Sequence, residues 1–486
     1  MPPSPGRATI NVVAPLRDFR FLQTGTGPVA DRAGALLGLL GAEVVVAHDA
    51  ATAAAVARHG EIASDAGDGV GAQREAARGT VRVGASTEGA VADGLRAAAA
   101  VVELLSDLGG HRVAVDGPGL AAERAQLLDL PPGGATTAGG AGRMVRAADD
   151  WVAVNLPRPS DADLLPAWLG CPIDDGADLW AAVEAALSER AAADVVSSGQ
   201  ELGLAVARVV SPREAATDAQ TTARHQGFPM TPFLLDGRPP PPAGPQPLTE
   251  PGPLDVRPRA RPRPLAGARV VDLSSLWAGP LATSLLCDAG AEVIKVESTG
   301  RPDGARVGSR AFFDLLNAGK RSVALPLPDP AAVAQLQALI DTADLVVEAS
   351  RPRALDQLGI LRHRQWLTLT AYGAAGPWRQ WSGFGDDAAV AGGLVGGSPD
   401  APTFLGDAVA DPLAGLHAAV AGLAVLVGTP TRVDLALREV ANHVVGDGVP
   451  GPLPATDVRR TRPGRAPALG EANPELLGDL SAPVSR

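Results

Sequence analysis

The sequence is poor in cysteine and aromatic residues, and it has no long apolar run. Its two cysteines, Cys171 and Cys287, provide neither a disulfide framework nor a set of metal ligands. Aromatic side chains make up 3% of the 486 residues, so the core must be built mainly from alanine, valine and leucine. No apolar run reaches the ~18 residues that a membrane helix needs, and residues 1–13 lack a signal-peptide pattern. We therefore expect a cytoplasmic protein.

The charge balance argues against strongly anionic partners. The formal net charge is −12, whereas nucleic acids and anionic membranes select a basic surface, so we predict that neither is a partner. Lysine is also scarce: Lys295 and Lys320 are the only two, and every other basic residue is arginine or histidine. Their closeness in the sequence favours a site for an anionic small molecule, although chance or a surface helix end explains the pair equally well.

Two stretches in different halves of the chain have nearly the same pattern. Residues 27–49 read GPVADRAGALLGLLGAEVVVAHD, and residues 279–297 read GPLATSLLCDAGAEVIKVE. Each contains a Gly-Pro turn, a helix of small residues and an apolar strand. The repetition predicts two related halves, of which only the second keeps a lysine.

The first half reads as alternating strands and helices, followed by a hairpin and further helices. A glycine-rich loop at 131–142 interrupts the pattern, and the Asp-Asp turn within 143–156 predicts the hairpin. The other predicted elements are strands at 8–14, 42–48 and 113–117, and helices at 29–41, 91–108, 177–188, 190–196 and 211–220.

A proline-rich segment, residues 236–264, separates the halves, and proline at this density forms an extended spacer. Beyond it, strands and helices alternate, which is typical of a parallel α/β sheet covered on both faces. Ligands of such sheets bind at the carboxyl ends of the strands. The predicted strands are 268–274, 291–297, 321–327, 344–350 and 365–373, the helices are 281–290 and 329–343, and the ligand loops are 276–280, 297–306, 348–353 and 372–377.

Five motifs occur in order over roughly residues 267–427. They are RVVDLSSLWAGPLATSLLCDAGAEVIKVES, NAGKRSVALPLPDP, ADLVVEASRPRALDQLGI, AYGAAGP and GDAVADPLAGLHAAVAGLAVL. Together they resemble the family III CoA-transferases, the CaiB/BaiF group. The first half resembles the same family more faintly, through RMVRAADDWVAVNLPRPSDADLLPAWLG and GAVADGLRAAAAVV. We interpret the chain as a tandem form with a degenerate first copy.

The resemblance implies an α/β fold with a Rossmann-like open parallel sheet as the large domain and a smaller α+β domain. It also implies a homodimer or a pseudo-dimer within one chain. The resulting division is a degenerate first half at 1–135, a small-domain-like region at 136–235, a proline-rich linker at 236–264, a catalytic domain at 265–435 and a C-terminal tail at 436–486 that packs on the large domain.

The activity that the resemblance implies is transfer of CoA from an acyl-CoA to a carboxylic acid, with CoA as substrate and no tightly bound cofactor or metal. The family's nucleophilic aspartate corresponds to Asp411. The structural alternative is a helix N-cap, since Asp followed by Pro is typical of a helix start. Asp407 is the rival nucleophile, Asp93 is the expected inert counterpart in the first copy, and His417 is expected to pack within a helix.

The same resemblance places CoA against the strand-end loops, where arginine is suited to phosphate. A solvated surface is the alternative for each arginine, and departures at Ser298, Ala349 and Gln357 remove three family contacts. The predicted CoA-binding residues are Leu276, Trp277, Ala278, Gly279, Pro280, Arg301, Arg306, Lys320, Arg351 and Arg353.

Two other functions remain open at this point. A racemase or isomerase of the same fold needs an imidazole base, and residues 383–393 contain no histidine. A non-catalytic acyl-CoA binder is the second alternative. The glycine-rich loop at 131–142 is either a cover over the thioester or a plain linker.

Overall fold

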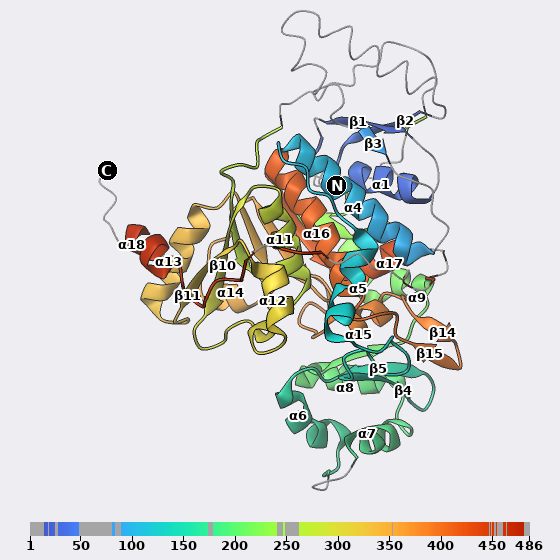
Figure 1. Cartoon of the computed structure of the whole chain (residues 1–486). Coiled ribbons are helices and arrows are strands. Elements are labelled where there is room, and N and C mark those ends of the chain that lie inside the picture. The colour runs from blue at the N-terminus through green and yellow to red at the C-terminus, as the bar shows by residue number, and fades with distance from the viewer. Residues whose placement is uncertain are drawn as a thin grey trace, which may run out of the picture.

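The computed structural model describes most of the chain and is shown in Figure 1. The described residues are 14–47 (except 18 and 25–27), 80–82, 89–173, 178–240, 246–247, 262–351, 353–446 and 448–480 (except 449, 452, 454–459 and 463).

Within these residues, seven strands form the sheet of the large domain. The order is β11-β10-β9-β12-β13-β16-β7, and all neighbours are parallel except β16 and β7. Because β9 pairs with both β10 and β12, the order reverses there, and such a reversal is where open α/β sheets bind ligands. The strands are β9 (Arg269–Leu273), β10 (Glu292–Ser298), β11 (Arg321–Leu325), β12 (Leu345–Glu348), β13 (Trp366–Thr370), β16 (Arg432–Ala436) and β7 (Phe233–Leu235).

Helices cover both faces of this sheet. Val270 and Val271 of β9 point to opposite faces, as successive strand residues do. Val270 joins the apolar cluster of α11 and α16, whereas Val271 joins that of α13 and α18. The helical elements are α11 (Ala278–Asp288), η1 (Gly304–Arg306), α12 (Arg310–Asn317), α13 (Pro330–Asp341), α14 (Arg353–Gln357), α15 (Gly385–Ala391), α16 (Ala410–Val427), α17 (Leu437–Val445) and α18 (Asn473–Leu480).

The N-terminal part forms a second α/β unit, in which α1 packs on α4 and α4 packs along α16 (Figure 1). Its described strands are parallel, in the order β3-β1-β2-β8. In each half a β-α-β unit thus contacts a long helix, α4 in the first half and α16 in the second. That the two halves arose by duplication stays a prediction. The elements are β1 (Arg20–Thr24), α1 (Pro28–Leu39), β2 (Glu43–Ala47), β3 (Thr80–Arg82), α4 (Ala90–Leu108), α5 (Gly117–Leu128) and β8 (Gln246–Pro247).

A small domain follows, built on an antiparallel sheet in the order β4-β5-β6. Its own core contains Val152, Trp168 and Val195. On the other face of β5, Ala153 packs with Val390 and Phe404 of the C-terminal half. Its elements are β4 (Gly142–Arg146), β5 (Trp151–Asn155), α6 (Pro159–Leu169), α7 (Leu179–Leu187), α8 (Ala192–Leu202) and β6 (Ala205–Arg208). The next two helices, α9 (Pro212–Thr217) and α10 (Ala219–His225), pack against the C-terminal half instead, where Arg224 Nε donates to Glu439 Oε1 of α17 at 2.7 Å.

The strand predicted at 113–117 is wrong. Residues 111–116 have no regular structure, and α5 begins at Gly117, with Pro118 among its first residues. Proline is favoured in a first helical turn, because its missing N–H would be unpaired there anyway. The strand predicted at 8–14 and most of the linker at 236–264 lie outside the described residues.

The hairpin predicted within 143–156 and the helix predicted at 329–343 are both present. The helix starts as expected, because the Asp329 side chain accepts hydrogen bonds from the N–H groups of Ala331 and Ala332. Strand β7 was missed, since three apolar residues before a proline-rich stretch are too few to show a period.

Among the described helices, only α16 is apolar and long enough to cross a membrane, and 94% of it is buried inside the protein. Burial on that scale is what the central helix of a folded core shows.

Candidate active site

Asp411 lies in the first turn of α16. That helix begins at Ala410, and no side chain among the described residues caps its N-terminus. Asp411 therefore does not act as the N-cap, which was the structural alternative to a catalytic role. The Asp411 N–H donates to the carbonyl of Ala408 at 2.8 Å, and the residue keeps partial access to solvent.

Three other aspartates influence Asp411: Asp386 and Asp387 in α15, and Asp407. Burial raises the pKa of Asp411 to about 7; the charge of Arg124 acts to lower it, and the three carboxylates act to raise it. Burial also raises the pKa values of Asp386 and Asp387 to about 7. At neutral pH the cluster therefore carries fewer than four negative charges.

Arg124, from α5 of the N-terminal unit, holds Asp407. Its Nε lies 2.7 Å from Asp407 Oδ2, and its Nη2 donates to Oδ1. The guanidinium carbon lies 4.8 Å from the ring centre of Trp277. A bidentate pair of this kind fixes both groups. Asp407, the rival nucleophile, is thus engaged by Arg124, whereas among the described residues no such bidentate pair holds the Asp411 carboxylate.

The backbone before α16 approaches α15 closely. A Cβ placed on Gly385 would lie 2.5 Å from Asp411 Oδ2 and 2.4 Å from the carbonyl oxygen of Ala408. Ala408 has a φ of 45°, in the left-handed region, and its N–H donates to Asp386 Oδ1 at 2.9 Å. Such a conformation costs a non-glycine residue about 1–3 kcal/mol, and strain of this kind clusters at functional sites.

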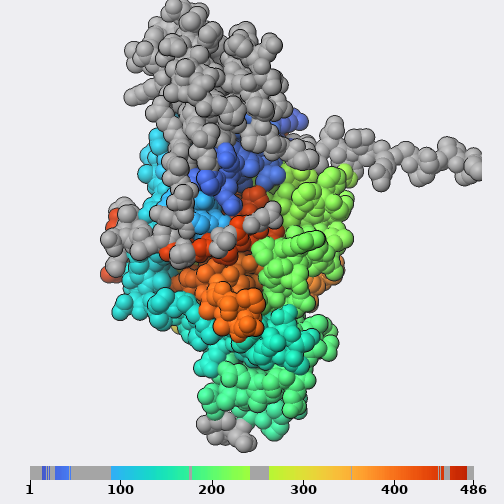
Figure 2. All heavy atoms as spheres, turned by 90° about the vertical axis from the view of Figure 1, so that its right-hand side faces the viewer, coloured from blue at the N-terminus to red at the C-terminus, as the bar shows by residue number. Residues whose placement is uncertain are grey.

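The small domain contributes Asn155 to the same region. Its amide donates to Asp387 Oδ1 at 3.0 Å, and the Phe384 N–H donates to the same oxygen at 3.0 Å. The other oxygen of Asp387 and the Tyr372 hydroxyl have no hydrogen-bond partner among the described residues. The N-terminal unit, the small domain and the C-terminal half therefore meet around Asp411; Figure 2 shows orange C-terminal residues between the teal small domain and the blue N-terminal unit.

The predicted CoA loop, 276–280, connects β9 to α11 at the reversal in strand order. Leu276 is 42% exposed and has a φ of 70°. Trp277 is buried and packs edge-on against Phe312, with ring centres 5.2 Å apart. Ala278, Gly279 and Pro280 are buried as well. Leu276 is therefore the side chain of this loop that a ligand can reach directly.

Glycine is required at position 279. A Cβ there would lie 2.2 Å from the Cβ of Ser274. The loop is also tied to the 297–306 loop, because the Leu276 N–H donates to Asp303 Oδ1 at 3.0 Å.

Both lysines support this loop from inside the protein. Lys295 Nζ donates to the carbonyl of Ser274 at 2.8 Å and forms an ion pair with Asp303 at 2.9 Å. Lys320 Nζ donates to the carbonyl of Pro280 at 3.0 Å and pairs with Asp272 at 3.0 Å. The two ammonium groups thus hold the two ends of the loop.

Lys320 was expected to bind a CoA phosphate, but its buried position shows a structural role instead. The side chain is completely buried, and Thr283 Oγ1 at 2.7 Å and Asn317 Oδ1 at 2.9 Å are further partners. An ammonium group has three hydrogens, and these four partners leave none for a phosphate. Burial lowers the pKa of Lys320 to about 8.

Three of the four predicted arginines come together. Arg301, Arg351 and Arg353 are exposed, and Arg351 donates to Ser382 Oγ at 2.7 Å. Burial lowers the pKa of Arg351, and the charges of Arg158, Arg353 and Arg301 lower it further. Arg158, from the small domain, was missed by the sequence analysis. A group of like charges in one place is suited to an anion.

Arg306, the fourth, is engaged elsewhere. Its Nη2 lies 2.6 Å from Glu297 Oε2, and its guanidinium carbon lies 4.5 Å from the ring centre of Phe313. It therefore holds the 297–306 loop rather than presenting a free guanidinium.

The glycine-rich loop at 131–142 lies against the segment that precedes α16. The Phe404 N–H donates to the carbonyl of Gly134 at 2.8 Å. A Cβ on Gly133 would lie 2.7 Å from the carbonyl oxygen of Gly406, and one on Gly139 would lie 4.0 Å from Arg124 Nη2. The loop is thus more than a surface linker, since it contacts the neighbours of Asp407.

Two residues of the earlier hypotheses are plainly internal. Asp93 is 5% exposed, and one of its oxygens has no partner among the described residues. His417 is 2% exposed and shares a hydrogen bond of 2.8 Å with the Leu413 carbonyl. Burial lowers the pKa of His417 to about 4, so it packs as a neutral ring, as predicted.

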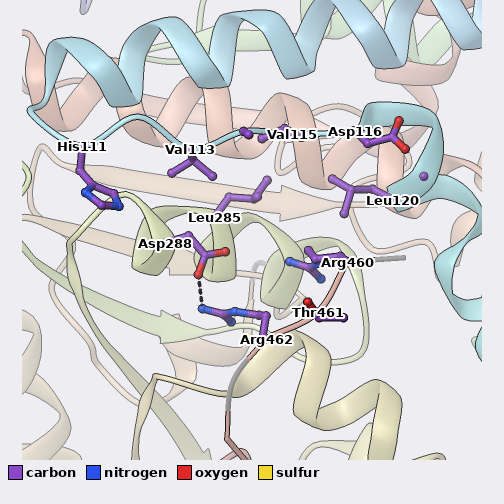
Figure 3. Close-up of a pocket in the computed structure, with 12 residues that line it drawn as sticks. His111, Val113, Val115, Asp116, Leu120, Leu285, Asp288, Arg460, Thr461 and Arg462 are labelled. Atoms are coloured by element: carbon purple, nitrogen blue, oxygen red, sulfur yellow. Dashed lines mark hydrogen bonds and ion pairs between the residues drawn. The ribbon is translucent and has the colours of Figure 1, made fainter. Parts of the chain in front are cut away.

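A cavity of about 410 Å³ lies between residues 111–120, α11 and residues 460–462. Figure 3 shows Asp288 and Arg462 joined by an ion pair at its side. The cavity touches the C-terminal end of α11, whereas the 276–280 loop precedes the N-terminal end, roughly 15 Å away for 11 residues. None of the predicted CoA-binding residues lines it.

The described geometry is that of an α/β domain with a cluster of aspartates, Asp386, Asp387, Asp407 and Asp411, close to a strand-end loop. Residues 265–471 match the family model described as CoA-transferase family III. This segment, less than half of the chain, is therefore similar to the family III CoA-transferases. The α/β fold class expected from the sequence is the one observed.

Several enzymes are similar to this chain. A succinyl-CoA–D-citramalate CoA-transferase of Chloroflexus aurantiacus is 33% identical over 34% of this chain and 46% of its own length. A probable fatty acyl-CoA transferase of Mycobacterium tuberculosis is 36% identical over 37% of this chain and 52% of its own length. The human succinyl-CoA:glutarate CoA-transferase is 34% identical over 34% of this chain and 42% of its own length.

The chain spans about half the length of the curated relatives that it matches. Among solved structures, a CaiB/BaiF family protein of Brucella suis is 29% identical, with a TM-score of 0.34, over 38% of this chain and 56% of that chain.

Proposed function

We propose that this protein is an acyl-CoA transferase that moves CoA from an acyl-CoA donor to a carboxylic acid, with Asp411 as the nucleophile. The observation that carries the proposal is the state of Asp411: it lies in the first turn of α16, partly open to solvent, and does not cap the helix. The names of the similar enzymes support the reaction class.

In the proposed first stage, the ionised Asp411 carboxylate attacks the thioester carbonyl. The carbon–sulfur bond breaks, CoA leaves as a thiolate, and a mixed anhydride forms. The thiolate then attacks the Asp411 carbonyl carbon of the anhydride, so that the donor acid leaves as a carboxylate and an aspartyl-CoA thioester remains. Splitting one difficult step into two easier ones is the general advantage of covalent catalysis.

The second stage reverses the first with the acceptor acid. Its carboxylate attacks the aspartyl thioester and expels the thiolate, which then attacks the acceptor acyl carbon. Acyl-CoA leaves, and the Asp411 carboxylate is restored. No net proton is transferred in either stage, so the reaction needs an ionised Asp411. The N–H groups at the start of α16 favour negative charge that develops there.

We further propose that the CoA phosphates bind to the group formed by Arg158, Arg301, Arg351 and Arg353. Arg351 is crowded by the other three positive charges, and a bound polyanion would offset that repulsion. Lys320 and Arg306 are left out, because Lys320 is completely buried and the Arg306 guanidinium lies against Glu297 and Phe313. Arg158 also pairs with Asp161, but 30% of its side chain is exposed and can reach a ligand.

We propose that the two halves pair within one chain, since α4 packs along α16. On this view the first half acts as the partner of the second and needs no nucleophile of its own.

Trapping the covalent intermediate tests the proposal. The full chain is incubated with an acyl-CoA such as succinyl-CoA or a fatty acyl-CoA, treated with hydroxylamine or borohydride, and digested for mass spectrometry. Modification of the peptide that bears Asp411, together with its absence in Asp411→Asn, supports the proposal. Turnover in Asp411→Asn, or a label on another residue, rejects Asp411 as nucleophile.

Two further measurements, of CoA binding and of hydrogen exchange, separate the alternatives. CoA binding without any label or exchange in the wild-type protein indicates a non-catalytic acyl-CoA binder. Exchange of an α-hydrogen of the acyl group with deuterated water, without CoA transfer, indicates a racemase or isomerase.

A further inference from the structure

Arg124 stands outside the segment that matches the CoA-transferase family, residues 265–471, yet it lies at the candidate site. It reaches Asp407 across 283 positions of sequence. The pair joins α5 of the N-terminal unit directly to the segment that carries Asp411.

We infer that Arg124 is a positioning residue for the proposed nucleophile: from the N-terminal half, it keeps Asp411 in the ionised, attacking form. The inference rests on the proposed function. It makes the site a composite to which the N-terminal half supplies the essential positive charge.

The charges that act on Asp411 explain why a cation is needed. Asp386 and Asp387 act on it from α15, and Asp407 from the segment before α16; all three oppose its ionisation. Arg124 is the charge with the largest effect on Asp411, and it favours ionisation. A protonated carboxyl is not a nucleophile, so the balance between these charges controls the fraction of active enzyme.

The geometry keeps this cation in place. Arg124 makes a bidentate contact with Asp407. The Asp407 side chain is 2% exposed and that of Arg124 is 26% exposed, so the contact is largely shielded from solvent. The Trp277 ring lies on one side of the guanidinium, 4.8 Å from its carbon. A contact with a ring face adds to the attraction of the ion pair. Arg124 therefore acts as a fixed charge rather than as a mobile surface group.

A fixed cation predicts a specific change in the dependence of rate on pH. Without Arg124, Asp411 should stay protonated to a higher pH, so activity is lost near neutral pH and recovers in alkaline solution. A shift of one pH unit in the rising limb corresponds to about a tenfold loss of rate below the wild-type midpoint. A purely structural defect would lower the rate at every pH by a similar factor.

The experiment measures initial CoA-transfer rates of the full-length protein from about pH 5.5 to about pH 9.5. Arg124→Gln is compared with Arg124→Lys, which keeps the charge but loses the planar fork. Arg112→Gln is the matched control, because Arg112 is an exposed arginine of the same N-terminal unit that pairs with Glu103. Because Arg124→Gln leaves Asp407 unpaired and buried, the double variant with Asp407→Asn guards against a failure to fold.

The inference is supported if the rising limb of the pH–rate profile moves to higher pH by about one unit in Arg124→Gln. The displacement should be smaller in Arg124→Lys and in the double variant, and Arg112→Gln should show none. The yield of trapped Asp411 adduct at each pH should follow the same order. Folded variants whose profiles keep the wild-type midpoint overturn the inference while leaving the proposed function intact. Wild-type protein that transfers no CoA, or Asp411→Asn that still does, overturns the proposed function instead.

Discussion

Lys320 and Asp272 form an ion pair in which neither side chain is exposed to solvent, with 3.0 Å between Nζ and Oδ2. The same ammonium group donates to the carbonyl of Pro280. One charge pair therefore connects the end of β9 to the loop that we propose binds CoA. Its role is structural, and it makes loop geometry depend on a buried charge.

Replacing Lys320 by Met should destabilise the protein by about 3–5 kcal/mol, because Asp272 would be left buried without its partner. Urea unfolding at neutral pH measures the loss. Arg301→Gln, which removes an exposed charge, should change stability by less than about 0.5 kcal/mol. Partial recovery of stability is expected when Asp272→Asn is added to Lys320→Met; no loss in the single variant would contradict the paired, buried state.

The arginine group should determine affinity for CoA rather than stability. Exchanging Arg301 and Arg353 for Gln together should weaken CoA binding by roughly tenfold or more, since each lost charge-assisted contact is worth about 1.5–3 kcal/mol at most. Calorimetric titration at two salt concentrations measures the change and should show a weaker salt dependence. The control is Arg208→Gln, an arginine of the small domain that pairs with Glu214. Unchanged affinity in the double variant would remove this group from the CoA site.

A methyl group at position 133 should disturb the candidate site. The new Cβ would lie 2.7 Å from the carbonyl oxygen of Gly406, next to Asp407, whereas Gly134 has open space around its Cβ position. Gly133→Ala should therefore reduce the rate of CoA transfer about tenfold or more while Gly134→Ala stays near wild type. Steady-state rates of both variants, with CoA affinity measured alongside, test this; equal rates would show that the loop only passes over the site.

The carboxylate cluster should make stability depend on pH in an unusual direction. Burial raises the pKa of Asp386 to about 7, so between about pH 4 and about pH 7 the folded state holds a proton that the unfolded chain has released. By linkage, this group's contribution to stability falls as pH rises through that range.

Asp386→Asn removes the effect. The variant should be more stable than wild type by about 1–3 kcal/mol at pH 8, and the difference should shrink toward pH 4. Chemical unfolding at both ends of the range measures it. Asp163→Asn, at an exposed position, should show no such trend. A constant difference at all pH values would mean that the carboxyl is not protonated in the folded state.

The sequence predicted the parts of the site that depend on local pattern. The 276–280 loop and Asp411 were expected because five sequence motifs resemble those of the family III CoA-transferases. Arg124 and Asn155 were missed, because their contacts with Asp407 and Asp387 span 283 and 232 positions. No local pattern marks an arginine in a short helix as the partner of a distant carboxylate.

The lysines show the other limit. Their clustering favoured a site for an anionic small molecule, whereas both side chains are buried and support the 276–280 loop from inside. The direction of a side chain depends on what packs around it. Lys295 and Lys320 lie in strands or turns whose flanking residues suit either a surface or a core. Both lysines point into the core because they are buried beside the acceptors Asp303 and Asp272. Neither the burial nor the acceptors can be predicted from the spacing of the lysines in the sequence.

The edge strand β7 has a consequence for how the protein is made. Phe233–Leu235 finds its partner in Val433–Leu435 of β16, which a ribosome synthesises about 200 residues later, or roughly 10–40 s at the usual elongation rate. Until then the nascent chain carries an unpaired apolar segment beside a proline-rich tether. The molecule can complete its largest sheet only after β16 has been translated, so a product truncated before β16 would retain that edge as a point of attachment for other chains.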